Sequence, residues 1–241
     1  MFNPKTIVVI GASGAIGGAF VEYYGKQYPD ATLLCFARSN AHNSLSNQHH
    51  YTIDVSIESS IHDAAVIASG FDAIDLLIVA TGTLHSEYYF PEKSLQALSM
   101  KAFEDVYKIN TIGPALILKH FIPLLSKNTH SIAALLSARV GSISDNHLGG
   151  WYAYRASKAA LNMVIKNASI EVARKNKYCA VIGLHPGTVN SPLSKPFQAN
   201  VPHGKLFSAQ DSVNHMANVI QHICAADSGK CFAYDGTIIE Y

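Results

Sequence analysis

The start of the chain constrains the fold more than any other part. The apolar run 5–10, Lys-Thr-Ile-Val-Val-Ile, predicts a fully buried strand. Gly11-Ala-Ser-Gly14-Ala-Ile-Gly17 follows it directly, and a helical pattern then continues to about residue 27. Glycines at a strand-to-helix turn bring backbone amides close to a pyrophosphate, which the helix N-terminus also attracts. The segment therefore predicts a dinucleotide-binding turn, the alternative being a purely structural turn.

The remaining chain alternates apolar runs with amphipathic ones. Strands are expected at 31–37, 51–53, 74–80, 131–137, 179–184 and 231–239, and helices at 56–68, 99–125, 152–175 and 208–226. An interruption of the helix 99–125 is expected at Gly113-Pro114, and loops at 38–50, 82–97 and 190–207. This alternation predicts one α/β domain over residues 1–241, a Rossmann-type doubly wound fold with about seven parallel strands and helices on both faces.

Composition excludes several classes of function. The formal net charge is +1 and the basic residues are scattered, so neither nucleic acid nor an anionic membrane surface is expected as a partner. No apolar stretch reaches the roughly 18 residues of a membrane span. Four widely spaced cysteines favour reduced thiols and a cytoplasmic location. The twelve histidines form no His-x-x-x-His pair with a glutamate, so no metal is expected.

The end of the second expected strand bears on the choice of dinucleotide. NAD sites usually place an acidic residue there, to hold the ribose hydroxyls. This strand ends Cys35-Phe-Ala-Arg38-Ser39, without a carboxylate. Because a guanidinium suits a 2′-phosphate, Arg38 favours NADP(H), with NAD(H) still possible. The other interpretation is a solvated arginine in a loop.

Tyr154 and Lys158 are spaced four residues apart in an expected helix, so they lie on one face. A free phenol has a pKa of about 10. A nearby ammonium favours the phenolate and lowers that pKa, which would make Tyr154 a usable general acid or base. The alternative is a half-buried tyrosine beside a solvated lysine, because this spacing also occurs by chance.

Several motifs together resemble one family. Gly11 to Gly17, Asp54-Val55, Asn110, Tyr154-x-x-x-Lys158 and Pro186-Gly-Thr-Val189-Asn-Ser191 occur in the order and spacing of the short-chain dehydrogenases/reductases, over nearly the whole chain. The stretch 138–158 looks most like the branch of C-factor and sniffer-type carbonyl reductases. The resemblance implies cofactor contacts from Gly11, Ser13, Gly14, Ala15, Ile16, Gly17, Arg38, Asp54, Val55, Ala80, Thr81, Gly82, Tyr154, Lys158, Pro186, Gly187, Val189 and Ser191.

The resemblance also implies individual roles. Asp54 would hydrogen-bond the adenine, Pro186 to Val189 would form the wall beside the nicotinamide, and Ser191 would bind the carboxamide. Tyr154 would protonate a carbonyl oxygen as hydride arrives. Lys158 would bind the nicotinamide ribose and lower the pKa of Tyr154. Asn110 would support a water-linked proton path to Lys158. Simpler structural readings stay open: a carboxylate near a helix start for Asp54, a buried polar kink for Asn110 and a strand-ending turn for Pro186-Gly187.

Three departures from the family pattern stand out. Ala15 replaces the usual middle glycine, a spacing also found in the longer epimerase-like branch. Val79-Ala80-Thr81-Gly82 replaces the usual Asn-Asn-Ala-Gly, so the asparagine contacts must be absent or replaced. Ala138 occupies the usual position of the catalytic serine. Ser137 is our candidate for polarising the substrate oxygen, and Ser142 is the other hydroxyl within reach.

The leading hypothesis is an NADPH-dependent oxidoreductase acting on a small carbonyl or alcohol substrate. Two alternatives remain: a cofactor-binding signalling or regulatory protein with little turnover, as the C-factor likeness permits, and an epimerase or dehydratase with a tightly held nucleotide. His85, Tyr88, Tyr89 and Phe90 either line the substrate pocket or pack as a lid. Trp151 and Tyr152 face substrate or a second subunit. The resemblance implies a homodimer or homotetramer through helices 99–125 and 152–175.

Overall fold

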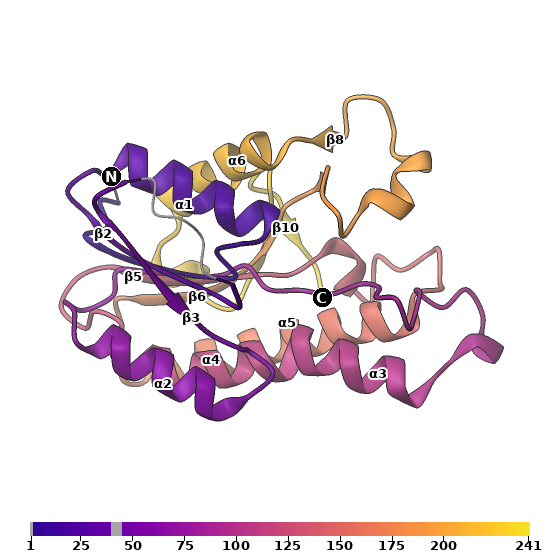
Figure 1. Ribbon diagram of the computed structural model, residues 1–241, viewed down its shortest axis with the longest axis horizontal. Helices are drawn as coiled ribbons and strands as arrows, with labels where there is room; N and C mark the ends of the chain where they lie inside the picture. Colours follow the sequence, from indigo (N-terminus) through magenta and orange to yellow (C-terminus); the bar gives the residue numbers. More distant parts are fainter. Residues whose placement is uncertain (1, 40–44) are drawn as a thin grey trace.

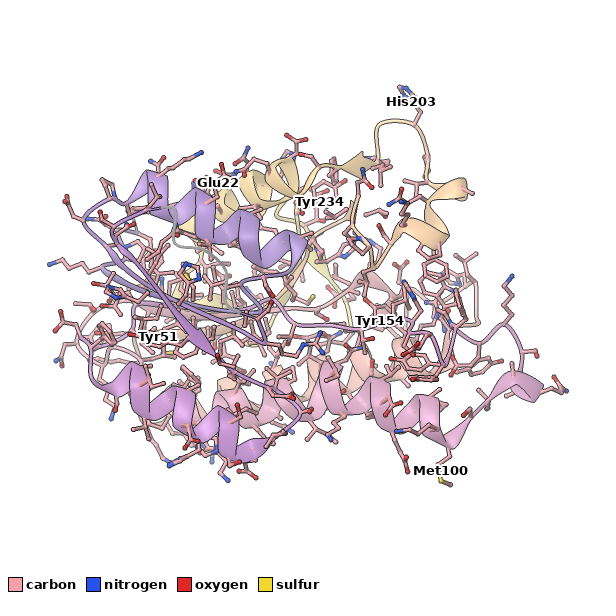
Figure 2. All side chains as sticks on the ribbon, viewed as in Figure 1. Glu22, Tyr51, Met100, Tyr154, His203 and Tyr234 are labelled. Carbon is pink, nitrogen blue, oxygen red and sulfur yellow. The ribbon has the colours of Figure 1, made fainter. Side chains whose placement is uncertain are left out.

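An eight-stranded sheet forms the centre of the computed structural model, which describes residues 2–39 and 45–241 (Figure 1). Its order is β10-β9-β6-β5-β4-β1-β2-β3. Neighbouring strands are parallel except β9 and β10, which are antiparallel. The strands are β1 (Thr6–Ile10), β2 (Thr32–Ala37), β3 (Gln48–Thr52), β4 (Leu76–Val79), β5 (Ser131–Leu136), β6 (Cys179–His185), β9 (Cys231–Ala233) and β10 (Ile238–Ile239). The single α/β domain is confirmed, with one strand more than expected.

The additional strand comes from the end of the chain. Residues 231–239, expected as one strand, form β9, a turn and β10. Asp235 Oδ1 accepts hydrogen bonds from the backbone and side chain of Thr237, and Gly236 has a φ of 83°. Gly236 supplies the left-handed residue of the turn and the Asp235 side chain holds it, so the chain reverses there.

The third strand also differs from the sequence-based expectation. β3 begins at Gln48 instead of residue 51 and pairs in parallel with β2, from Leu33↔Gln48 to Ala37↔Thr52. His49 and His50, expected in a loop, therefore lie in this edge strand. Polar side chains suit an edge strand that is only half-buried, which is why the apolar pattern missed its beginning. Of the expected loop 38–50, residues 40–44 lie outside the described part of the chain.

Helices cover both faces of the sheet (Figure 1). α1 (Ala15–Gln27) and α6 (Ala209–His222) lie on one face, and α2 (Glu58–Ser69), α4 (Gly113–Phe121) and α5 (Tyr152–Ala173) on the other. Side chains of β1 alternate between the layers: Ile7 and Val9 pack toward α1 and α6, and Val8 and Ile10 pack toward the opposite helices. No helix in the described residues is long and apolar enough to cross a membrane.

The expected helix 99–125 is interrupted, as predicted at Gly113-Pro114. It comprises α3 (Met100–Tyr107), a π-helical turn Lys108–Ile112, α4, and a 3-10 turn Ile122–Leu124. Pro114 has no N–H for the carbonyl of Asn110 four residues earlier, and its ring would crowd that oxygen. The wider turn accommodates the proline and places Asn110 fully inside the molecule.

The sheet order reverses direction beside β1. β2 and β3 extend to one side of β1, and β4, β5 and β6 to the other. A crevice forms at such a point, outside the carboxyl ends of the strands, and open α/β sheets bind ligands there. The expected loops 82–97 and 190–207 reach this edge and contain short elements: 3-10 turns Leu95–Ala97 and Lys195–Asn200, and β8 (Leu206–Phe207), which pairs with β7 (Thr188–Val189).

Candidate active site

A cleft of about 280 Å³ opens at the carboxyl ends of β1, β2 and β4. Its position matches the crevice that the sheet order creates. Most of the predicted cofactor residues from the first half of the chain line it. The lining consists of Gly11, Ser13, Gly14, Ala37, Arg38, Ile53, Asp54, Val55, Ala80, Thr81, Gly82, Thr83 and Ile109.

The glycines shape this cleft through backbone geometry. Gly11 has a φ of 91°, and a Cβ there would lie 2.9 Å from the carbonyl of Ala80. A Cβ at Gly17 would lie 2.1 Å from the Gly11 oxygen, so Gly17 allows the helix to pack against the turn without itself lining the cleft. Gly14 precedes α1 and provides no side-chain cap, which leaves the first N–H groups of the helix without a side-chain acceptor.

Arg38 and Asp54 are the two charged residues that line the described part of this cleft. Arg38 is exposed, and no hydrogen bond holds its guanidinium within the described residues. Asp54 Oδ1 accepts a hydrogen bond from the Ser56 backbone N–H at 2.9 Å. Hydrogen bonds from Ser56 lower the pKa of Asp54, and the charges of Arg38 and Lys108 lower it further. Asp54 therefore both fixes the turn before α2 and lines the cleft.

Thr81 replaces an asparagine of the family pattern and has an unsatisfied hydroxyl. Its Oγ1 is buried in the cleft wall without a hydrogen-bond partner. A buried polar atom without a partner costs free energy, which a ligand group would recover. The uncapped helix start, the close backbone approach at Gly11 and this hydroxyl together fit a nicotinamide dinucleotide.

A second cavity, of about 220 Å³, lies beside the start of α5. Tyr154 and His185 are the ionisable residues in its lining, and no carboxylate, lysine or arginine of the described chain lines it. It brings together Tyr154, Ser137, Ile16 and the predicted nicotinamide-wall residues. The full lining is Ile16, Leu84, Ser137, Ala138, Val140, Trp151, Tyr154, His185, Pro186, Gly187, Thr188, Val189, Ser191, Leu193, Ser194, Phe197 and Val201.

Tyr154 lies on the first turn of α5, and Lys158 one turn later. The buried Lys158 Nζ donates a 2.8 Å hydrogen bond to the Leu136 carbonyl and lies 6.0 Å from the centre of the Tyr154 ring. Burial raises the pKa of Tyr154 to about 12 and lowers that of Lys158 to about 8. The sequence predicted a lowered pKa for Tyr154, whereas its pKa is raised. Removal from water disfavours the phenolate, and Lys158 is not close enough to offset this effect.

Asn110 connects the π-helical turn to the loop after β4. It accepts a hydrogen bond from the Thr83 N–H and donates one to the Thr83 carbonyl, both at 2.8 Å. Its amide also donates to Ser157 Oγ, which in turn donates to the Tyr154 carbonyl. A Cβ at Gly82 would lie 3.6 Å from Asn110 Oδ1 and 3.8 Å from Lys158 Nζ. Gly82 therefore separates these two polar groups at the edge of the cofactor cleft.

The serines near Tyr154 lie in different places. Ser137 lines the cavity, but its hydroxyl donates a 2.6 Å hydrogen bond to Asn162 Oδ1 on α5. Ser142 lies outside that lining, where its Oγ contacts Ser144 Oγ at 3.2 Å and accepts the N–H of Asp145. Ala138 is on the cavity wall and offers no hydroxyl. The choice of Ser137 as the polarising hydroxyl stays a prediction.

Comparison with known proteins decides the family. The sequence model of the short chain dehydrogenase family matches residues 5–202. The chain belongs to that family. Its members are NAD(P)-dependent oxidoreductases, so the catalytic class expected from the sequence is confirmed.

Two relatives show how far the sequence likeness extends. A 1-hydroxy-2-glutathionyl-2-methyl-3-butene dehydrogenase of Rhodococcus is 34% identical, over 98% of this chain and 100% of its own. The C-signal protein of Myxococcus xanthus is 36% identical, over 56% of this chain and 76% of its own.

Two solved structures share the fold of this short-chain dehydrogenase. An NADPH-bound carbonyl reductase from chicken fatty liver superimposes with a TM-score of 0.86 at 23% identity, covering all of both chains. The carbonyl reductase Sniffer of Drosophila melanogaster gives 0.85 at 21% identity, covering 98% of this chain and 99% of its own. Together with C-signal, they confirm the predicted likeness to the C-factor and sniffer-type branch.

Sequence reasoning missed Glu92, which holds the start of α5. Glu92 is buried; its carbonyl accepts the Trp151 N–H at 2.5 Å, and its Oε2 accepts the Ala153 N–H at 3.2 Å. Trp151 precedes the helix in a left-handed conformation, with a φ of 52°, and supplies no side-chain cap. A carboxylate at a helix N-terminus satisfies free N–H groups and complements the helix dipole. No local sequence signal reveals such a cap, because Glu92 lies far away along the chain.

Aromatic rings close one side of the cavity. Trp151 packs against Tyr154 and Phe197, with ring centres 6.2 and 5.0 Å apart. His85 stacks on Phe90 at 5.6 Å and meets Phe197 edge-on at 5.7 Å. Trp151 and Phe197 line the cavity, whereas His85 and Phe90 pack outside them. The lid interpretation of 85–90 fits this arrangement better. Among the described residues, no group of three or more His, Cys, Asp or Glu is placed to hold a metal ion.

Proposed function

We propose that this short-chain dehydrogenase binds NADP(H) and transfers hydride between the nicotinamide and a small carbonyl or alcohol substrate, with Tyr154 as general acid or base. The observation that carries the proposal is the position of Tyr154 in an uncharged cavity, with the Lys158 ammonium held near its ring by Leu136. Gly82, on the cofactor cleft, lies next to Lys158. This arrangement supports a proton donor beside the residues proposed to hold the nicotinamide.

The residues proposed to hold NADP(H) follow the two cavities. Backbone amides at Gly11 to Gly17 and the free start of α1 would receive the pyrophosphate. Arg38 would bind the 2′-phosphate, and Asp54 and Val55 the adenine. Pro186 to Val189 would face the nicotinamide, with Ser191 on its carboxamide. The NADPH in the solved chicken carbonyl reductase supports the choice of NADP(H).

A protonated Tyr154 suits the role of general acid in carbonyl reduction at neutral pH. The bound nicotinamide supplies the hydride. Tyr154, with a pKa of about 12, keeps its proton under these conditions and can give it to the substrate oxygen. Asn110 holds the Thr83 backbone and contacts Ser157, which positions the first turn of α5. We propose the Asn110 side as the entry of a water-linked proton path to Lys158.

The donor opposite Tyr154 is the remaining catalytic assignment. Ser137 is our candidate among the serines because it lines the cavity, whereas Ser142 does not. To polarise a carbonyl oxygen, the Ser137 hydroxyl must turn from Asn162 to the cavity. Another donor in the same cavity would not need this rearrangement.

The cavity favours an uncharged substrate. Its lining is mainly aliphatic and aromatic, and no cationic side chain of the described residues lines it to bind a carboxylate or phosphate. The name of the Rhodococcus relative denotes a glutathionyl alcohol. In this chain the carboxylates of such a conjugate would have no cationic partner within the cavity. We therefore propose small neutral aldehydes, ketones and alcohols.

We propose a homodimer or homotetramer in the cytoplasm. The outward faces of α4 and α5 support self-association: Met163 and Ile170 are exposed, at 61% and 46%, and a groove between the helices is lined by Leu118, Ile122 and Val164. Light scattering after size-exclusion chromatography would show the assembly. Met163→Glu should shift it to monomer, and an unchanged mass would remove these helices as the interface.

Kinetics with a set of carbonyl compounds tests the function. The protein should oxidise NADPH in the presence of uncharged aldehydes and ketones. It should oxidise NADH more slowly at equal concentration. Binding of NADPH without turnover of any substrate would favour the regulatory alternative, to which the C-signal likeness points. One equivalent of dinucleotide retained through purification, with no net NADPH oxidation, would favour an epimerase or dehydratase.

A further inference from the structure

His185 ends β6 next to the end of β5. Leu184 pairs with Leu136, and the Ser137 N–H donates to the Leu184 carbonyl at 2.8 Å. A Cβ at Gly183 would lie 3.4 Å from Ile165 Cδ1 of α5. Because side chains alternate along a strand, His185 points to the same face as Gly183, toward the layer that contains α5. His185 and Tyr154 accordingly line the same cavity.

The two ring nitrogens of His185 have different surroundings. Nδ1 is buried and has no hydrogen-bond partner, whereas Nε2 is not enclosed in this way. A neutral imidazole carries one proton, on either nitrogen. An N–H at the enclosed Nδ1 would lose its hydrogen bond to water and gain none. The proton therefore belongs on Nε2, where a ligand in the cavity can accept it.

The charge state of His185 supports the same role. Burial, with a smaller effect of the nearby Arg139 charge and against that of Asp235, lowers the pKa of His185 to about 4. The ring is neutral at physiological pH and presents one donor, without a charge that would attract a carboxylate.

Besides Tyr154 and His185, the described lining has five side chains with a donor group, and of these Ser137 alone directly follows β5 or β6; the others are Trp151, Thr188, Ser191 and Ser194. The Ser137 proton is donated to Asn162, and Ala138 has no hydroxyl. The Ser194 hydroxyl donates to the Val189 carbonyl in the loop after β6. The position usually held by a catalytic serine is thus chemically vacant in this chain, while an imidazole without hydrogen bonds lies on the adjacent strand.

We propose that His185 is a catalytic residue that donates a hydrogen bond from Nε2 to the substrate oxygen protonated by Tyr154. Ser137 then keeps its bond to Asn162 and supports α5. The inference rests on the proposed function and changes one assignment within it. His185 transfers no proton: Tyr154 gives the proton and the cofactor the hydride. The imidazole N–H stabilises the negative charge that develops on the oxygen.

Four variants in the full-length protein test this assignment. His185→Phe keeps a planar ring and removes both nitrogens. His185→Gln places an amide N–H near the position of Nε2, whereas the shorter side chain of His185→Asn reaches only the position of Nδ1. Ser137→Ala removes the competing hydroxyl. Rates of NADPH oxidation would be measured with benzaldehyde and cyclohexanone as uncharged probes, together with NADPH affinity and thermal unfolding.

The expected result is specific to the donor. His185→Phe should lower kcat about 100-fold, with little change in KM, because the hydrogen bond strengthens as charge develops. His185→Gln should restore kcat to within about tenfold of wild type, and His185→Asn should not. NADPH affinity and the unfolding midpoint should stay close to wild type in all three. Ser137→Ala should lower kcat less than about threefold.

Other results would overturn the inference. Wild-type kcat in His185→Phe, or equal losses in the Gln and Asn variants, would show that Nε2 does not act as the donor. A large loss in Ser137→Ala with active His185 variants would return the role to the serine and leave the proposed function intact. If wild-type protein oxidised NADPH with none of the carbonyl compounds, the proposed function would fail, and this inference with it.

Discussion

The cleft proposed for the cofactor and the cavity proposed for the substrate lie at the same edge of the sheet but are built differently. Backbone conformation shapes much of the cleft: a positive φ at Gly11, the close packing of Gly17 and the uncapped start of α1. Side chains from five separate segments shape the cavity, from Ile16 to Val201. A short motif can encode the first, whereas the second exists only after distant segments have packed together.

The two regions also differ in charge. Arg38 and Asp54 face the cleft, and solvent reaches both. The cavity is lined by Tyr154 and His185. Burial raises the pKa of Tyr154 and lowers that of His185, so both side chains are neutral at physiological pH. The cleft therefore suits a charged dinucleotide, and the cavity suits an uncharged substrate. Substitutions can distinguish the two regions. A change in the cleft should weaken cofactor binding, whereas a change in the cavity should lower kcat.

The largest effect is expected at Tyr154. Tyr154→Phe removes the acid and leaves the ring, so kcat for carbonyl reduction should fall about 1000-fold. NADPH affinity should change little, because the cleft remains intact. Steady-state kinetics and a fluorescence titration with NADPH measure the two properties. Tyr152→Phe, on the same helix and outside the cavity lining, is the matched control. A loss below tenfold at Tyr154 would contradict its role.

The next effect tests the cleft through its backbone. Gly17→Ala places a methyl group 2.1 Å from the Gly11 oxygen and should lower the free energy of unfolding by about 3 kcal/mol, with weaker NADPH binding. Gly18→Ala is the control, because its methyl group would lie 3.4 Å from the nearest atom, the Ala12 oxygen, and alanine favours the helix. Urea unfolding measures the stability of both variants. Equal stability of the two variants would refute a backbone-built cleft.

A third effect concerns Lys158, at the boundary of the two regions. Its folded pKa of about 8 lies below the ordinary value, so between these values the unfolded chain binds more protons than the folded one. Folding stability should therefore rise with pH there, by about 2 kcal/mol between about pH 7 and pH 9.5. Lys158→Met should remove that rise. Urea unfolding at several pH values measures the difference, and a rise that persists in the variant would assign it to another group.

The choice of cofactor should depend on one exposed charge. Arg38→Ala should weaken NADPH binding about tenfold and leave NADH binding within about threefold, because only NADPH carries the 2′-phosphate. Titrations with both dinucleotides at low and moderate salt measure the effect, which should shrink as salt increases. Lys26→Ala, another exposed cation, serves as control. If NADH binding weakened equally, Arg38 would contact a group common to both dinucleotides.

The smallest effect is expected at Glu92. Glu92→Gln keeps an acceptor for Ala153 but removes the charge at the start of α5, so the free energy of unfolding should fall by about 1 kcal/mol. A decrease in kcat of only a few-fold should follow, because Tyr154 lies in the helix turn that Glu92 holds. Chemical unfolding and kinetics measure both, with the exposed Glu87→Gln as control. Unchanged stability would mean that the uncharged amide of the variant caps the helix as effectively as the carboxylate does.

Local patterns in the sequence were enough for most of the fold. Runs of buried β-branched residues identified the strands, and glycine spacing identified the dinucleotide turn. The reversal at Asp235-Gly236 was missed, although the pair is itself a local turn signal, because the apolar residues on both sides of it were assigned to one strand. The beginning of β3 was missed because it lies in a polar edge strand. Tyr154 and Lys158 were found together because an interval of four residues is a local property of any helix.

The sequence by itself determined the family, the tyrosine–lysine spacing of the proposed site and the position of the glycine turn, since each depends on neighbours along the chain. Only the tertiary structure decided where the Ser137 proton goes, that Glu92 holds α5, and that the buried Nδ1 of His185 has no hydrogen-bond partner among the described residues. It also reversed the expected direction of the Tyr154 pKa. These properties depend on distances through space and on the exclusion of water, which arise only when distant segments pack together.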